Sequence, residues 1–420
     1  MRRALRGNIL PLGLVSLLTD FSSEMIYPLL PAFFSGLVPA AAAAVYIGLM
    51  DGVAESVSGL LKIWSGGWSD RSGRRKALAL AGYSLSGLAR PLIALAAAGW
   101  HVVALRFLDR VGKGIRTAPR DALIGEAADP DVRGLAFAFH RMMDHAGAVS
   151  GPLVAALLLY LFLGRGFLWV RGSGPAGPEE MHALRRLFAL ALLPGIAASV
   201  IFWRKVREIP RPASMPPAGA GGNRTSGPPR SFYFFLSSVT VFTLGNSTDL
   251  FLVFFAQTRF GLGLGWMIAL WILLHLSKII FSLPGGRLSD RIGRRPAILI
   301  GWMVYAAVYA TIPSAGGLTA VCVLLVLYGA YYGLTEGAER ALIADRVPVA
   351  SRGRAYGLYH GAVGFAALPA SLLFGLFWAR LGPAIAFRIG ASLAAAACML
   401  LLAARPGRNE AERAPDGRGR

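Results

Sequence analysis

The sequence is poor in charge, in acidic residues and in cysteine. Asp, Glu, Lys and Arg make up 15% of its 420 residues, whereas 55% are hydrophobic and the mean hydropathy is +0.55. Soluble domains carry about 25% charged residues, so this composition excludes a soluble enzyme or binding domain and indicates an integral membrane protein. The two cysteines, Cys322 and Cys398, lie singly in apolar segments. They offer neither a disulfide framework nor the spacing of metal ligands, and we interpret both as packing residues.

Basic residues outnumber acidic ones, 43 to 22, which gives a net charge of +21. In a soluble domain this surplus would suggest nucleic acid. Here the arginines gather in short gaps between apolar runs, as the positive-inside rule describes for membrane proteins. We therefore expect the lipid bilayer as a partner and no nucleic acid.

Apolar runs of about 20 residues, the length that a helix needs to cross a bilayer, recur along the chain. Six of them precede a stretch rich in Pro, Gly and Arg, and six follow it. Breakers in a row predict a linker. The sequence predicts an all-α membrane protein with 12 transmembrane helices in two pseudo-symmetric six-helix bundles. The expected parts are an N-terminal bundle over 1–203, a linker over 204–230, a C-terminal bundle over 231–404 and a tail over 405–420.

Two short patterns occur twice at nearly the same distance. Gly66-Gly-Trp-Ser-Asp-Arg-Ser-Gly-Arg-Arg-Lys76 returns as Gly286-Arg-Leu-Ser-Asp-Arg-Ile-Gly-Arg-Arg295, and the two aspartates are 220 residues apart (290 − 70). The segments 121–126 and 340–345 share Ala-Leu-Ile, and their leucines are 219 residues apart (342 − 123). This period is about half of the chain, so we expect an internal duplication of a domain-sized unit.

The basic loops alternate with loops that carry almost no charge. By the positive-inside rule the basic loops are cytoplasmic, and an even number of spans then places both termini there. One connection fits poorly, because it would place basic residues outside: Arg165, Arg171, Arg185 and Arg186. The basic N-terminus is followed by a run that is too long for a signal peptide and contains Asp20 and Glu24, so we expect a first spanning helix.

Twelve spans in two halves, a central linker and the pattern G-x-L-x-D-R-x-G-R-R resemble the major facilitator superfamily of secondary transporters. Arg110-Val-Gly-Lys113-Gly in span four is similar to its fourth-span arginine motif, with Lys113 where glutamine is usual. Gly147-Ala-Val-Ser-Gly151-Pro152 is similar to the span-five motif of its antiporters, although alanines replace the closing glycines. The resemblance covers essentially the whole chain and implies transport by alternating access, without naming the solute.

The resemblance also implies that the repeated pattern joins the two halves on the cytoplasmic side. Glycines there allow close approach and sharp turns, and Asp70 can accept hydrogen bonds from the N-terminus of a neighbouring helix. The alternative is a plain positively charged turn. The expected cytoplasmic gate consists of Gly66, Asp70, Arg71, Gly73, Arg74, Arg75, Gly286, Asp290, Arg291, Gly293, Arg294 and Arg295.

Ionisable residues inside spans are costly, so each should face a cavity or a partner. In the first half we expect a site for coupling protons and for the cavity at Asp20, Glu24, Asp51, Glu55, Asp109, Arg110, Lys113, Arg116 and Asp144. Of these, Asp20, Glu24, Asp51 and Glu55 are the candidate proton carriers, with Arg110 as the partner that switches. In the second half we expect cavity residues at Asp249, Lys278 and Glu336. The alternative is a static network of ion pairs that holds helices together.

The patterns of enzymes and metal sites are incomplete. Gly112-Lys-Gly114 lacks the spacing of a phosphate-binding loop, and Gly261-Leu-Gly-Leu-Gly265 follows no strand. His140 and His145 have no further ligands near them in the sequence. We expect no enzymatic activity, no cofactor and no metal.

We therefore expect a monomeric, proton-coupled transporter of a prokaryotic inner membrane that exports a small organic solute. One alternative is uptake or exchange of an organic anion, which Lys113 and Arg116 could bind. Another, of a different class, is a receptor or scaffold that transports nothing. The sequence leaves the solute, the direction and the stoichiometry open.

Overall fold

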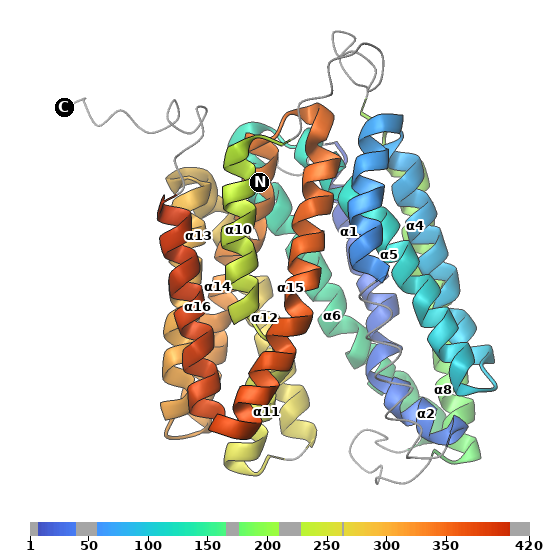
Figure 1. Ribbon diagram of the computed structural model, residues 1–420. Coiled ribbons are helices and arrows are strands. Elements are labelled where there is room, and N and C mark those ends of the chain that lie inside the picture. The colour runs from blue at the N-terminus through green and yellow to red at the C-terminus, as the bar shows by residue number, and fades with distance from the viewer. Residues whose placement is uncertain (1–6, 39–56, 165–175, 210–227, 263, 404–420) are drawn as a thin grey trace.

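The computed structural model describes residues 7–38, 57–164, 176–209, 228–262 and 264–403. Within these residues the regular structure is helical throughout (Figure 1). Helices satisfy their backbone hydrogen bonds internally, as a segment surrounded by lipid must. Nine helices in the described residues are long and apolar enough to cross a membrane.

Within the described residues, the first half consists of helical segments, several of them broken at a proline or a turn. In chain order its elements are α1 (Ile9–Glu24), η1 (Tyr27–Leu29), α2 (Leu30–Leu37), a helix over described residues 57–72, α4 (Arg75–Ala89), η2 (Pro91–Leu95), α5 (Gly99–Ala127), η3 (Pro130–Val132), α6 (Arg133–Leu163), α8 (Pro178–Leu190) and α9 (Leu192–Lys205).

The second half repeats this order. Its elements are α10 (Arg230–Gly245), α11 (Leu250–Phe260), α12 (Leu264–Ile292), α13 (Arg294–Thr311), η4 (Ile312–Ser314), α14 (Leu318–Arg346), η5 (Val349–Ser351), α15 (Arg352–Leu381) and α16 (Pro383–Ala403). The all-α fold expected from the sequence is confirmed.

Each half packs as a bundle. In the first, α1 contacts α6 and α9, and α4 contacts α5 and α9; in the second, α13 packs against α14 and α16, and α10 against α15 and α16. Large apolar side chains such as Leu161, Leu193 and Leu372 remain exposed on the outer faces, as expected for surfaces that meet lipid tails. The polar residues of the spans therefore lie inside and between the bundles.

The halves meet through α6, which contacts α12 and α14, and through α5, which contacts α14 and α15. They approach at the face that carries the start of α1 and the ends of α9 and α16, and they diverge toward the opposite face (Figure 1). We call the first face, which carries Ile9, Lys205, Arg230 and Ala403, the basic side.

The two copies of the repeated pattern differ by one residue in their turn. Gly73 and Gly293 both adopt positive φ, 67° and 95°, a conformation that favours glycine. In the first copy both Gly73 and Arg74 lie outside the helices, whereas in the second only Gly293 does. The extra residue explains why the repeat distance is 220 at the aspartates and 219 further along the chain.

Candidate functional site

On the basic side, an aspartate from each half caps a helix of the other half. Asp70 accepts hydrogen bonds from the backbone N–H groups of Gly353 (3.0 Å) and Arg354 (2.6 Å), at the start of α15. Asp290 accepts from Gly134 and Leu135, both at 2.9 Å, at the start of α6. Free N–H groups and the helix dipole favour a carboxylate at these two places.

One arginine in each copy holds the capping aspartate and reaches across the interface. Arg75 pairs with Asp70 at 2.8 Å and with Glu126, and it donates to the carbonyl of Val349 in the other half (3.0 Å). Arg294 makes the equivalent contacts: it pairs with Asp290, with Asp345 at 3.2 Å, and donates to the carbonyl of Pro130 at 3.0 Å. The equivalent of Arg294 is thus Arg75, because the turn of the first copy is one residue longer.

Further polar contacts between the halves surround these pairs. Arg133 at the start of α6 forms an ion pair with Asp345 (2.6 Å), and Arg352 at the start of α15 donates to the carbonyl of Gly125 (3.3 Å). The other arginines of the predicted gate lie in different surroundings. Arg295 donates to the carbonyls of Leu401 and Leu402 at the end of α16, whereas the side chains exposed on the surface are Arg71, Arg74 and Arg291.

Glycines set how closely the halves approach on the basic side. A Cβ added to Gly66 would collide with the backbone of Gly353, and one added to Gly286 would meet the backbone of Gly134 at 2.9 Å. Gly67, the neighbour of Gly66, has nothing within 4 Å of the same position. Close packing between the halves therefore requires glycine at position 66 but not at position 67.

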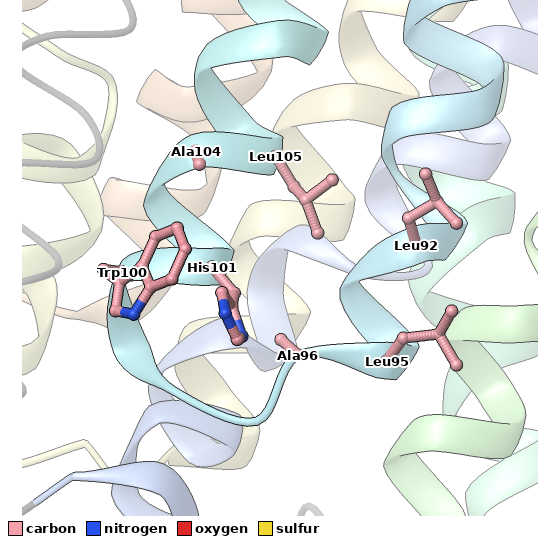
Figure 2. A pocket seen from close by; sticks show the side chains of 7 residues that line it. All are labelled: Leu92, Leu95, Ala96, Trp100, His101, Ala104 and Leu105. Atoms are coloured by element: carbon pink, nitrogen blue, oxygen red, sulfur yellow. The ribbon is translucent and has the colours of Figure 1, made fainter.

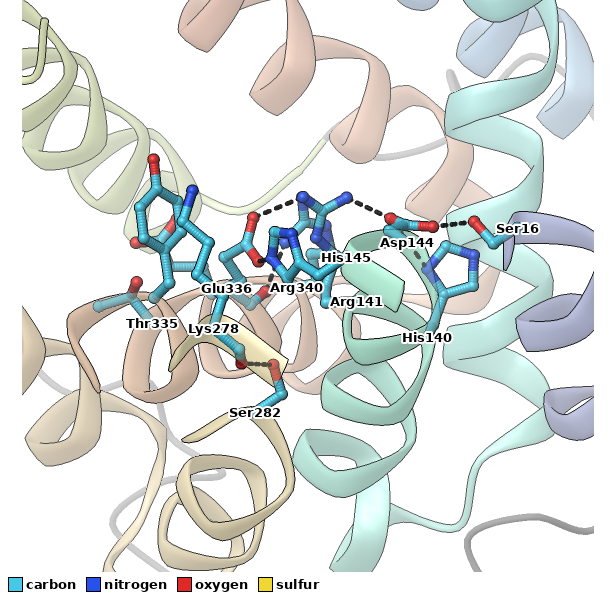
Figure 3. A network of polar contacts seen from close by, with 12 residues as sticks. Ser16, His140, Arg141, Asp144, His145, Lys278, Ser282, Thr335, Glu336 and Arg340 are labelled. Carbon is cyan, nitrogen blue, oxygen red and sulfur yellow. Dashed lines mark hydrogen bonds and ion pairs between the residues drawn. The ribbon is translucent and has the colours of Figure 1, made fainter. Parts of the chain in front are cut away.

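Deeper in the molecule, a chain of polar contacts crosses from one half to the other (Figure 3). The guanidinium of Arg141 on α6 pairs with Asp144 on the same helix and with Glu336 on α14, the latter at 2.7 Å. His145 lies 3.1 Å from the second oxygen of Glu336, and Ser16 on α1 donates to Asp144. One cation is thus shared by two carboxylates that belong to different halves.

The carboxylates predicted in span one face the basic residues of α5. The charges that act on Asp20 include those of Asp144, Lys113, Arg116 and Arg90. Those that act on Glu24 include the charges of Asp20, Arg110, Arg106 and Lys113. The structure thus brings Asp20, Glu24, Arg110, Lys113, Arg116 and Asp144 into one region of the first bundle.

Asp109, also on α5, is held by arginines. Arg90 approaches it at 2.6 Å and Arg106 at 2.9 Å, and Arg110 is 3.8 Å away. This buried carboxylate is thus surrounded by three arginines, whose charges offset its own. Arg116 stacks on the ring of Tyr83 at 4.6 Å.

The glycines of span five pack against span one. Cβ atoms added to Gly147 and Gly151 would meet α1 at the backbone of Phe21 and at the Cβ atoms of Asp20 and Glu24, at 2.8 to 3.0 Å. Pro152 lies inside α6, which is helical from Arg133 to Leu163. These small residues bring the helix that carries Asp144 against the helix that carries Asp20.

In the second half, Asp249 and Lys278 form an ion pair at 2.6 Å. The hydroxyls of Tyr328 (2.8 Å) and Tyr332 (3.0 Å) also donate to Asp249. Both tyrosines lie on α14, as Glu336 does. The three residues predicted for the second half are therefore brought near one another by α12 and α14.

Two predicted residues cannot be placed, and several residues of the site were not predicted. Asp51 and Glu55 fall outside the described residues. Arg141, which links the halves, was not among the predicted site residues, although its spacing of three from Asp144 was a signal. Arg90, Glu126, Asp345 and Gly353 were also not predicted. The second repeated segment was the signal for two of them, because it ends in Glu126 in one copy and in Asp345 in the other. The signal for Arg90 was a single arginine in span three.

An apolar pocket of about 330 Å³ opens on the side opposite to the basic side, between η2 and α5 (Figure 2). It is lined by Leu92, Leu95, Ala96, Trp100, His101, Ala104 and Leu105. Nearby, Arg185 donates to the carbonyls of Ala94 and Ala96, so this basic residue of the poorly fitting connection closes the end of a helix. The pocket is separate from the polar network and we assign no solute to it.

Known proteins support this architecture across the whole chain. An uncharacterized MFS-type transporter of Methanocaldococcus jannaschii is 32% identical over 405 residues, 95% of each chain. An uncharacterized protein of Mycobacterium tuberculosis is 28% identical over 369 residues, 86% of this chain and 84% of its own. A multidrug resistance protein of Photorhabdus laumondii is 34% identical, but over only 28% of this chain and 29% of its own.

Solved structures share the fold at low sequence identity. The human organic anion transporter MFSD10 superposes with a TM-score of 0.73 at 17% identity, covering 95% of this chain and 99% of its own. The fucose:proton symporter of E. coli gives a TM-score of 0.75 at 12% identity, covering 95% and 98%. The family model of the Major Facilitator Superfamily matches residues 12–277 and 263–420. The chain therefore belongs to the Major Facilitator Superfamily of membrane transporters.

Proposed function

We propose that the protein is a proton-coupled secondary transporter that exports a small organic solute, and that Arg141 couples proton binding to the movement of the two halves. The observation that carries the proposal is the guanidinium of Arg141 between Asp144 of its own half and Glu336 of the other. Any motion that separates α6 from α14 must break the second pair.

A buried carboxylate that loses its cation is costly to leave charged, and taking up a proton removes that cost. Opening between the halves would thus be tied to protonation of Glu336, and closing to its release. Asp20 and Glu24 extend the path for protons into the first half, because the charge of Asp144 acts on Asp20 and that of Asp20 acts on Glu24.

Orientation and direction belong to the same proposal. The basic side is cytoplasmic by the positive-inside rule, which places both termini there and the open side outside. The protein then resides in the cytoplasmic membrane and works as a monomer. Export rests on the partial antiporter motif of span five, where Gly147 and Gly151 pack against α1, and on partial similarity to a multidrug resistance protein.

The test uses inside-out vesicles that carry the protein and are energised to an acidic interior. Lipophilic cations and drugs are added one at a time while the interior pH is followed. We expect acid loss with the wild type and with Arg204→Gln, a change at an exposed arginine of α9. Asp20→Asn and Glu336→Gln should lose most of the response. A wild-type response in both variants would reject the proton path.

Uptake or exchange of an organic anion is the second candidate, and the charges of α5 favour it. The Nε and Nη1 atoms of Arg116 are buried and have no hydrogen-bond partner among the described residues. Two results together would favour transport of an organic anion over export of a cation. The vesicle pH responds to organic anions but not to cations, and Lys113→Gln loses the response to anions. Flux no greater than that of empty vesicles for every compound would indicate a receptor or scaffold.

A further inference from the structure

The ammonium of Lys278 occupies a compact site made by other side chains of the second half. It lies 2.6 Å from the carboxylate of Asp249 and 3.7 Å from the ring centroid of Tyr332. The hydroxyls of Tyr328 and Tyr332 donate to the same carboxylate. A carboxylate beside an aromatic face is the combination that proteins use to bind organic ammonium groups.

A break in the seventh span positions the carboxylate. α10 ends at Gly245 and α11 begins at Leu250, so Asp249 directly precedes the second piece. The break is held by tyrosines: Tyr305 donates to the carbonyl of Gly245 (2.8 Å), and Asn246 donates to the hydroxyl of Tyr331 (3.1 Å). Discontinuous helices of this kind build the solute sites of many transporters.

The site adjoins the junction of the halves. The ring centroid of His145 on α6 lies 6.3 Å from that of Tyr332 and 5.6 Å from that of His275. The side chain of Asp249 keeps 13% of its surface exposed, whereas that of Lys278 keeps 4%. The carboxylate is thus close to the surfaces that separate during transport.

We propose that Asp249, Tyr328 and Tyr332 bind an organic cation, and that Lys278 occupies this site as a tethered substitute when no such cation is present. This deepens the proposed function by naming the class of solute. The lysine neutralises Asp249 in the empty transporter and is displaced when the solute enters. A tethered group competes at an effective concentration in the millimolar range, so it weakens every free ligand of the site.

The test is binding of radiolabelled tetraphenylphosphonium to the purified full-length protein in detergent, without any gradient. Lys278→Met removes the competitor and should tighten binding by about tenfold or more. Lys278→Arg keeps a tethered cation and should not tighten it. The single variant Asp249→Asn and the double variant Asp249→Asn/Lys278→Met lack the carboxylate. Both should bind tetraphenylphosphonium about tenfold or more weakly than Lys278→Met does. Lys205→Met, at the end of α9, is the control for loss of a lysine.

Lys278→Met leaves a buried carboxylate without its cation, so its thermal unfolding is measured in parallel. We expect a lower Tm than that of the wild type and a larger rise on adding tetraphenylphosphonium. Binding in Lys278→Met no tighter than in the wild type, together with no larger rise in Tm, would overturn the proposal and leave a structural ion pair. Loss of benzoate binding in Lys278→Met would also overturn it, in favour of an anion site.

These results do not depend on proton coupling. If the vesicles show no proton response while Lys278→Met binds the cation more tightly, the coupling mechanism is wrong and the cation site stands. If the vesicles respond to cations and the binding of Lys278→Met is unchanged, the export function stands and the cation is bound elsewhere.

Discussion

Asp121 of α5 and Arg340 of α14 occupy equivalent positions in the two halves, 219 residues apart (340 − 121), and their side chains lie 3.6 Å apart. Opposite charges at positions related by the duplication therefore pair with each other where the halves meet. His360 on α15 adds a contact to Asp121 at 2.6 Å, and Arg120 adds another at 2.8 Å. This one carboxylate of the first half thus gathers bases from both halves.

Asp121→Asn should destabilise the protein by about 3 to 5 kcal/mol, because it leaves buried cations without their carboxylate. Thermal unfolding in detergent measures the loss. Asp131→Asn, in the exposed turn η3, is the matched control and should change stability by less than about 0.5 kcal/mol. Equal Tm values for the two variants would show that the charges around Asp121 are compensated by water.

Asp70→Asn and Asp290→Asn should each loosen a different helix start. Asp70 accepts from the amides at the start of α15 and Asp290 from those at the start of α6, and a hydrogen bond to a charged group contributes about 1.5 to 3 kcal/mol. Hydrogen exchange should accelerate about tenfold or more at Gly353 and Arg354 in the first variant, and at Gly134 and Leu135 in the second. Each variant is the control for the other. Unchanged exchange at both helix starts would contradict the capping role.

Gly66→Ala should disfavour closure on the basic side, because the added methyl group collides with the backbone of Gly353. Overpacking of this kind costs about 1 to 3 kcal/mol. Gly67→Ala adds the same methyl group in open space and should behave as the wild type. Labelling of a cysteine introduced at Ser351, a buried serine directly before α15, in a background without Cys322 and Cys398, measures opening. Equal labelling rates in the two alanine variants would contradict the account.

The parts of the site that local patterns encode could be predicted from the sequence. Gly73 and Gly293 adopt positive φ and Asp70 faces a helix start, and a turn motif with its hydrogen-bond acceptor determines both features. The two repeat distances, 220 and 219, already contained the extra residue of the first turn. They did not locate it, because Arg74 and Arg75 look alike in the sequence and only one of them is buried.

Pairings between distant spans could not be predicted in the same way. Arg141 lies three residues from Asp144 and 195 residues from Glu336, and only the packing of α6 against α14 joins it to the second. The division of labour expected between the halves also becomes less sharp, since Glu336, predicted as a cavity residue of the second half, pairs with a cation of the first. The break before Asp249 leaves no strong signal, because Asn-Ser-Thr is short and the flanking runs are apolar.

The central claim is that the halves separate on the basic side in every transport cycle. Arg133→Cys and Asp345→Cys replace an ion pair that crosses this interface, in a background without Cys322 and Cys398. A short bifunctional thiol reagent should then join the halves and stop transport in vesicles, while each single cysteine variant treated in the same way keeps its activity. Transport that continues at the untreated rate, with the halves shown to be joined, would contradict the account.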